Sequence, residues 1–277
     1  MTAQHRRLPK IIFFDIDDTL YIKDQHCIPA SVKPALMSLK QRGVLLAIAT
    51  GRSLGIFPDA IKELVDEVKI DYLITLNGQY TQYQGKKLFD YPLEDEQIHQ
   101  ILAYFRTKNI ATACMSKDQV YALSVNDNLR TALGSLGIKY RLVNQDDICF
   151  AQPIYQILAF YRDYELDATP SLPATIKTTR WHDCAVDVLD KTSSKARAIK
   201  QLLASLAIDA QDAAAFGDHL NDLEMFEFVG TAIAMDNGHP AAKQAADIIC
   251  PRHDENGIAK ILHSLGWLRP ESTFVTK

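Results

Sequence analysis

The sequence predicts an α/β fold, in which a doubly wound parallel sheet is interrupted by an inserted α+β domain. Short apolar runs without helical periodicity recur early in the chain and again near its end. Helical patterns follow them, an alternation that is typical of parallel sheets. Between these two parts the strand patterns come in neighbouring pairs, as in an α+β layer. We therefore expect core segments over residues 1–79 and 184–277 and an inserted domain over residues 80–183.

The first part of the chain repeats a strand–helix pattern. A helix capped by Ser31 should run to about Arg42, and another should begin at Ser53 or a neighbour. The apolar runs between them suit strands that are buried on both faces. The expected strands are Ile11–Phe14, Val44–Ala49 and Tyr72–Leu76.

The middle and the last part complete the expected architecture. In the middle we expect a hairpin over 79–91, helices over Glu94–Lys108 and Asn126–Leu136, a strand pair over 110–124, and strands Ile154–Arg162 and Thr175–Arg180. In the last part we expect core strands Ala185–Leu189, Ala213–Phe216 and Thr231–Met235, a helix containing Lys195 and capped by Ser193 or Ser194, and helices from about Pro240 and over Gly257–Leu265. The two linkers, near Gly78 and near Cys184, are what a hinged lid requires.

Composition excludes several classes of protein. The net charge of −4 gives no sign of a nucleic-acid-binding surface. No apolar segment is long enough to cross a bilayer, and no signal peptide is expected. The five cysteines are scattered and never spaced as CxxC, which suits free thiols in a reducing cytoplasm.

Polar residues stand where the expected strands end, which is where parallel sheets bind ligands. Asp15, Asp17 and Asp18 follow the first strand, Thr50 the second, and Asn77 the third. Clustered carboxylates repel one another, so a hard divalent cation is the natural partner for them. The alternative is that these aspartates are solvated turn residues.

These residue types suit the transfer of a phosphoryl group. Asp15 can attack phosphorus and form an aspartyl-phosphate, and Asp17 can act as the second acid. Mg²⁺ can be held by the carboxylates of Asp15 and Asp218 and the main-chain carbonyl of Asp17, while Asp222 orients waters or Lys195. Positive charge and donors are needed to neutralise the phosphate. The residues expected to bind phosphate or substrate are Ile16, Thr50, Gly51, Asn77, Lys195 and Asn221.

Several of these signals have a structural alternative. Lys195 at a helix start, taken alone, is more often solvated surface. His219 lies among hard oxygen donors, so a role other than metal ligand is favoured. Trp181–Asp183 is either a packed hinge or a contact to the leaving group.

Together the motifs resemble the haloacid dehalogenase (HAD) superfamily, in particular the Cof-type phosphatases of subfamily IIB with a large cap. Asp15–Thr19 resembles the DxDGT motif, Thr50–Arg52 the second motif, Lys195 the third, and Gly217–Asp222 the GDxxND motif. Asn77–Gly78 and Met235–Asn237 resemble weaker family features.

The resemblance implies a Rossmann-like core, a mobile cap, Mg²⁺ dependence and hydrolysis of small phosphate esters such as sugar phosphates or pyridoxal phosphate. It implies Asp15 as the nucleophile and Asp17 as the acid/base. We expect a monomer or weak homodimer. The alternatives are a phosphomutase, a non-catalytic metabolite-binding protein and, less favoured, a dehalogenase. Asp18 and Asp236 depart from the family pattern, because each replaces a usual glycine.

Overall fold

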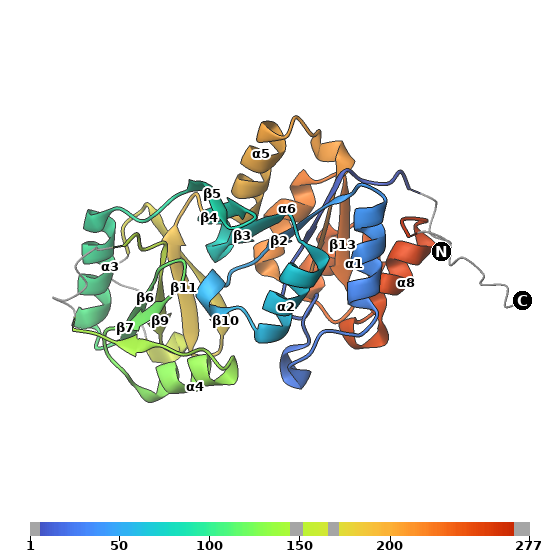
Figure 1. Ribbon diagram of the computed structural model, residues 1–277. Coiled ribbons are helices and arrows are strands. Elements are labelled where there is room, and N and C mark those ends of the chain that lie inside the picture. Colours follow the sequence, from blue (N-terminus) through green and yellow to red (C-terminus); the bar gives the residue numbers. More distant parts are fainter. Residues whose placement is uncertain (1–5, 145–151, 166–171, 269–277) are drawn as a thin grey trace, which may run out of the picture. The chain divides into compact units, whose positions relative to one another are not determined.

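The computed structural model describes residues 6–144, 152–165 and 172–268 (Figure 1). The chain divides into two compact units. Within the described residues, the first unit comprises 6–50, Pro58–Leu73 and 199–268, and the second comprises Gly51–Phe57 and Ile74–Ala198. Both units mix helices with a sheet, so the expected α/β class is confirmed.

The first unit is built on most of an eight-stranded sheet, in which its strands have the order β14-β13-β12-β1-β2-β3. Its strands are β1 (Ile11–Phe14), β2 (Leu45–Ala49), β3 (Tyr72–Thr75), β12 (Ala213–Gly217), β13 (Thr231–Met235) and β14 (Ile248–Cys250). The central strand β1 pairs in parallel with both neighbours, and Phe14 lies opposite Ile48 and Phe216. The carboxyl ends of these three strands therefore meet at one edge of the sheet.

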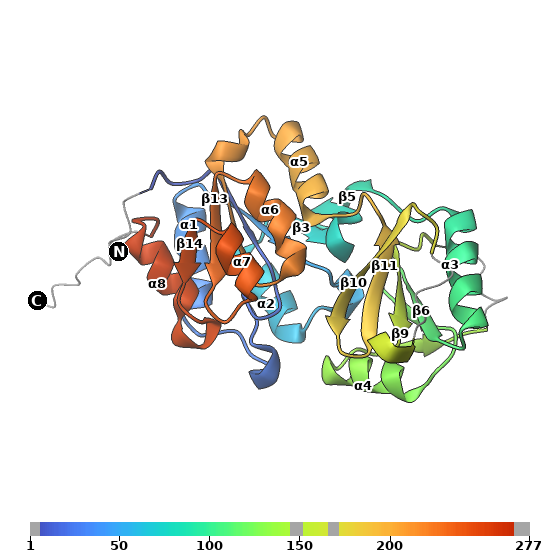
Figure 2. The ribbon, with the colours of Figure 1, turned by 180° about the vertical axis from the view of Figure 1, so that it is seen from behind.

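Helices cover both faces of this sheet. The helices α1, α2 and α8 lie on one face (Figure 1), and α6 and α7 lie on the other (Figure 2). Their bounds are α1 (Val32–Gln41), α2 (Asp59–Val68), α6 (Leu223–Phe228), α7 (Pro240–Ala245) and α8 (Gly257–Ser264). The side chains of β1 are buried on both sides, which explains the unbroken apolar run in its sequence.

One expectation for this part of the chain was wrong, and one strand was missed. The helix after β2 begins at Asp59 rather than near Ser53, and a short 3₁₀ turn, Leu54–Ile56, comes first. Pro58 disfavours the helical conformation for the residue before it, so the helix starts after the proline. The strand β14 was not expected, because it has three residues of which only Cys250 is fully buried.

The second unit contains a six-stranded sheet with the order β10-β11-β9-β6-β7-β8. Its elements are β6 (Ala111–Met115), β7 (Val120–Ala122), β8 (Arg141–Leu142), β9 (Gln156–Phe160), β10 (Ile176–His182), β11 (Ala185–Asp190), α3 (Asp95–Thr107) and α4 (Asp127–Ser135). Alternate residues of one strand serve opposite faces: Leu158 packs with the residues of α4, and Ile157 packs with those of α3. Each face of the sheet is therefore covered by one helix.

The expectation that Ala185–Leu189 is a core strand was also wrong. This segment forms β11, which pairs antiparallel with β9 and β10. Because helices cover both faces of the second sheet, its strands also read as continuous apolar runs. Hydrophobicity alone could not assign this strand to one sheet or the other.

The remaining elements connect these parts of the chain. The strands β4 (Tyr80–Tyr83) and β5 (Lys86–Asp90) form the expected hairpin. The helix α5 (Lys195–Ser205) begins in the second unit and continues into the first, and Ser194 Oγ accepts a hydrogen bond from the main-chain N–H of Arg197 at 3.1 Å. In the described part of the chain, no helix combines the length and apolar character needed to span a bilayer.

Candidate active site

The loop after β1 is fixed by main-chain hydrogen bonds. The N–H of Asp15 donates to the carbonyl of Phe216 at 3.0 Å, so Asp15 continues the pairing with β12. The N–H of Tyr21 donates to Ile16 at 2.8 Å, which closes the loop on itself. Asp15 and Ile16 are buried, and Asp17 is half-buried. The strand end therefore holds the Asp15 carboxylate in a defined position.

A second acidic loop follows β12. One carboxylate oxygen of Asp222 accepts the main-chain N–H groups of Asp218 at 2.8 Å and His219 at 2.9 Å. At Gly217 a Cβ would lie 2.5 Å from the carboxyl carbon of Asp222, so only glycine allows this close approach. Asp222 thus holds the loop that presents Asp218, and its expected role in orienting waters or Lys195 stays a prediction. Asn221 lies half-buried in the same turn.

The two loops bring three buried carboxylates together. One carboxylate oxygen each from Asp15, Asp218 and Asp222 lies within 4.8 Å of the others. Burial, followed by the charges of Asp15 and Asp222, raises the pKa of Asp218 well above its usual range. Hard oxygen donors at this spacing suit Mg²⁺, which would offset the repulsion among them. The residues present therefore fit the expected ion.

The structure explains why aspartate is tolerated at positions 18 and 236, where the family pattern usually has glycine. Asp18 has a φ of 55°, in the left-handed region that glycine adopts most easily and Asp tolerates. Its carboxylate pairs with Lys23 Nζ at 2.7 Å. Burial lowers the pKa of Lys23, but the bond to Asp18 and the neighbouring acidic charges outweigh it and raise the pKa overall. Asp236 does not have a positive φ, so its backbone does not require glycine.

Two residues support the acidic loops without having been assigned a role from the sequence. The side chain of Asn237 donates to the carbonyl of Asp18 at 2.9 Å and accepts the N–H of His253 at 3.0 Å. The hydroxyl of Thr19 donates to the carboxylate of Asp218 at 3.3 Å. Both residues lie inside motifs of the family pattern, and this position in a motif was the sequence signal that could have predicted their supporting role.

The other expected phosphate-binding residues lie near the boundary between the two units in sequence. Thr50 directly follows β2 in the first unit and is 1% exposed. Gly51, Asn77 and Lys195 belong to the second unit. Lys195 is the first residue of α5 and is also 1% exposed, so it is not the solvated surface lysine of the alternative interpretation.

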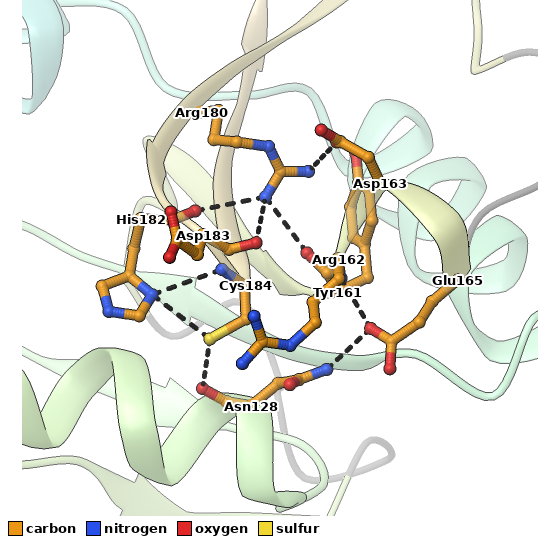
Figure 3. Close-up of polar contacts among 9 residues, drawn as sticks. All are labelled: Asn128, Tyr161, Arg162, Asp163, Glu165, Arg180, His182, Asp183 and Cys184. Atoms are coloured by element: carbon orange, nitrogen blue, oxygen red, sulfur yellow. Dashed lines mark hydrogen bonds and ion pairs between the residues drawn. The ribbon is translucent and has the colours of Figure 1, made fainter.

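The structure also bears on two open alternatives. His219 is exposed, its ring packs edge-on against His239, and it is not part of the acidic cluster. His182 Nδ1 lies 3.3 Å from the main-chain nitrogen of Cys184, and the carbonyl of Asp183 accepts a bond from Arg180 at 3.1 Å (Figure 3). These local contacts favour the packed, structural interpretation of the Trp181–Asp183 segment.

The comparisons with known proteins agree with this geometry. The family model of the haloacid dehalogenase-like hydrolases matches residues 12–262. "Putative phosphatase YkrA" of Bacillus subtilis is 35% identical over 94% of this chain and 99% of its own length. A 5-amino-6-(5-phospho-D-ribitylamino)uracil phosphatase of the same organism, YwtE, is 27% identical over 92% of this chain and 98% of its own. The solved structure of the HAD subclass IIB sugar phosphatase BT4131 has a TM-score of 0.83 and 26% identity, and the match covers 94% of this chain and 100% of that one. The chain therefore belongs to the haloacid dehalogenase-like hydrolases.

Proposed function

We propose that this protein is a Mg²⁺-dependent phosphatase that hydrolyses small phosphate esters through an aspartyl-phosphate. The observation that carries the proposal is the buried cluster of Asp15, Asp218 and Asp222, whose carboxylate oxygens lie within 4.8 Å of one another. A buried acidic cluster costs free energy unless a cation offsets it. A bound cation would offset this cost and would also attract the phosphate group of a substrate.

The residues that would hold Mg²⁺ are the Asp15 and Asp218 carboxylates and the main-chain carbonyl of Asp17. Asp222 already accepts two main-chain N–H groups, so its contribution would be to orient the loop and the ion's waters. When bound, the ion would neutralise negative charge on the phosphate and on the nucleophile.

The chemistry would be divided between two carboxyl groups. Asp15 would attack phosphorus, and the bond from phosphorus to the ester oxygen would break. Asp17 would give its proton to the leaving oxygen and later take a proton from the water that hydrolyses the aspartyl-phosphate. The half-burial of Asp17, against the full burial of Asp15, supports this division, because a proton donor must exchange protons with solvent.

The phosphate would be bound by neutral donors and one cation. Thr50 would contribute its hydroxyl, Lys195 its ammonium group, and Ile16, Gly51 and Asn221 their polar groups. Burial of the Lys195 side chain supports this role, because a lysine is almost never fully buried without an anionic or polar partner. Asn77 would also contribute a polar group to the phosphate, and its amide nitrogen in addition bonds to Asp187, which gives it a second role below.

The substrate class would be sugar phosphates or the pyridoxal phosphate class. A sugar phosphatase among the structural relatives supports the first, whereas the uracil-derivative phosphatase shows that related chains differ in substrate. A domain over residues 80–183 would select the leaving group. A cytoplasmic location and a monomeric or weakly dimeric state stay predictions.

Replacing Asp15 with asparagine tests the proposal. We expect Asp15→Asn to lose p-nitrophenyl phosphate hydrolysis by about 10³-fold or more while its circular dichroism is unchanged, because an amide is a poor nucleophile. Wild-type turnover by this variant in the presence of Mg²⁺ would refute the role of Asp15. A panel of phosphorylated metabolites separates the alternatives, since a phosphomutase would isomerise a sugar phosphate and a binding protein would release no phosphate.

A further inference from the structure

A strained turn follows β3 in the second unit. Leu76, Asn77 and Gly78 have φ values of 55°, 53° and 87°, so three successive residues occupy the left-handed region. For leucine this conformation is a clear outlier, because its branched side chain crowds the backbone. Such strain persists only where surrounding contacts fix it, and it concentrates at functional sites.

Buried contacts tie this turn to two other segments of the same unit. The N–H of Leu76 donates to the carbonyl of Arg52 at 3.0 Å. A Cβ placed on Gly51 would lie 3.1 Å from Asn77 Oδ1, and one placed on Gly78 would lie 2.1 Å from the carbonyl oxygen of Ser194. The turn therefore packs against the residues that follow Thr50 and the residue that precedes Lys195.

A buried carboxyl group anchors the turn from the other side. Asp187, on β11, accepts a hydrogen bond from Asn77 Nδ2 at 3.0 Å and another from Gln156 Nε2 at 3.1 Å. All three side chains are buried. Asp187 and Gln156 point to the same face of the sheet as Ala185 and Leu158, the face against which Leu76 packs. The carboxyl group and the strained turn thus share one buried face.

In the described ranges, the groups that bond to this carboxyl group are neutral. Among the described residues no cationic side chain bonds to Asp187, and the groups that act on it come from the turn, β9 and β10: Asn77, Gln156 and Trp181. The Trp181 indole lies close enough to lower the pKa of the carboxyl group, although its N–H is not well aligned for a hydrogen bond. Burial raises the pKa of Asp187 to about 7, against the opposing effect of the Asn77 and Trp181 contacts. A leucine or asparagine here would avoid this cost, which suggests that the carboxylate has a function.

We propose that Asp187 is a positioning residue: through Asn77 it holds the Leu76–Gly78 turn, and through that turn it fixes the main chain beside the two phosphate-binding residues, Thr50 and Lys195. This inference rests on the proposed function, which assigns phosphate binding to those two residues. Ionised Asp187 accepts both amide donors. Protonation removes the negative charge and turns one oxygen into a donor, so the hydrogen bonds from the two amides weaken and the turn is held less firmly.

The experiment compares Asp187→Asn with a control in the same unit. Asparagine is nearly isosteric and imitates the protonated form, because it too presents a donor to the two amides. Arg180→Lys is the control. Arg180 bonds to Asp163 and to the carbonyls of Tyr161, His182 and Asp183 (Figure 3), and none of these partners belongs to the turn. Inhibition by inorganic phosphate and kcat/KM for p-nitrophenyl phosphate are measured from pH 5.5 to pH 8.5 with saturating Mg²⁺. The ratio of each variant to the wild type cancels the titration of phosphate itself.

At pH 5.5 we expect Asp187→Asn and the wild type to have nearly the same kcat/KM and the same affinity for inorganic phosphate. At pH 8.5 the variant should have about tenfold lower kcat/KM and bind phosphate about tenfold more weakly, since it then lacks a hydrogen bond to an ionised group. For Arg180→Lys the ratio should be constant with pH, whatever its effect on stability. A constant ratio for Asp187→Asn as well would overturn the proposal and leave Asp187 a structural residue. The effect of Asp187→Asn should also vanish in an Asn77→Ser background, and additive effects would refute the route through Asn77.

A second variant, Asn77→Ser, and an NMR titration test the same link between Asp187 and the turn. Should Asp187→Asn not fold, Asn77→Ser removes the same hydrogen bond from the turn and should show the same pH-dependent loss. The side-chain amide signal of Asn77 in a ¹⁵N–¹H NMR spectrum should shift with a midpoint near neutral pH in the wild type and stay constant in Asp187→Asn. This signal needs no turnover. If the wild type neither hydrolyses nor binds phosphate, the proposed function fails, whereas an Asn77 signal that does not titrate refutes the link to Asp187.

Discussion

Replacing Asp218 with asparagine should make the metal-free protein more stable and abolish its stabilisation by Mg²⁺. The reason is the repulsion within the acidic cluster. For carboxylate oxygens within 4.8 Å of one another, Coulomb's law with an effective dielectric constant of about 20 gives roughly 3 kcal/mol per ionised pair. Proton uptake by the cluster limits this cost, so we expect a gain of about 1–3 kcal/mol in the free energy of unfolding without metal.

The same variant should no longer respond to Mg²⁺. At a concentration 100 times the dissociation constant, Mg²⁺ should stabilise the wild type by about 2.7 kcal/mol, and Asp218→Asn should gain little. Urea unfolding with EDTA and with MgCl₂ measures both quantities. The asparagine oxygen can still accept the Thr19 hydroxyl, so this hydrogen bond is kept, and the lost attraction to Lys23 is smaller than the repulsion that is relieved.

Asp71→Asn is the matched control in the same unit. Asp71 is also buried, but Lys40 Nζ lies 2.7 Å from one of its oxygens, and the other accepts the main-chain N–H of Leu46 at 2.9 Å. Its replacement should lower stability and leave the response to Mg²⁺ intact. If Asp218→Asn is less stable than the wild type in EDTA, or is stabilised by Mg²⁺ to the same extent, then the acidic cluster is not a metal site.

Three further predictions concern single residues. Asp17→Asn should lower kcat for p-nitrophenyl phosphate by about 10²–10⁴-fold and keep its Mg²⁺-induced rise in Tm, because the proposed metal ligand is the carbonyl; unchanged turnover would remove the acid/base role. Lys195→Ala should lower kcat/KM by about 10²–10³-fold through weaker phosphate binding and slower chemistry, and an unaltered value would count against it. The pKa of Asp187 is raised to about 7, so the folded state binds this proton more tightly than the unfolded state and the stability contributed by this group falls as pH rises from about 4 to about 7. Between pH 5 and pH 8 the wild type should therefore lose about 2–3 kcal/mol relative to Asp187→Asn in urea unfolding, and parallel pH profiles would contradict the raised pKa.

Local patterns in the sequence determined most of the first unit and of the acidic motifs. The apolar run Ile11–Phe14 is buried on both faces, and Asp15 follows it where a parallel sheet binds ligands. The caps at Asn126 and Ser194 were predicted as well, and each accepts a main-chain N–H of its helix. These features depend on near neighbours in the chain, so the sequence carries their signal directly.

Only the tertiary structure decided which sheet β11 joins and what Asp187 and Asn77 contact. Asp187 lies 110 residues from Asn77 and 31 from Gln156, and an aspartate between two valines gives no sign of either partner. The sequence placed Asn77 at a strand end and suggested phosphate as its ligand. That role stays a prediction, whereas the contact of its amide nitrogen with a buried carboxyl group had no signal in the sequence, because strand register and the left-handed turn set the direction of that side chain. Hydrogen bonds between distant segments follow from packing, which the pattern of residues along the chain does not encode.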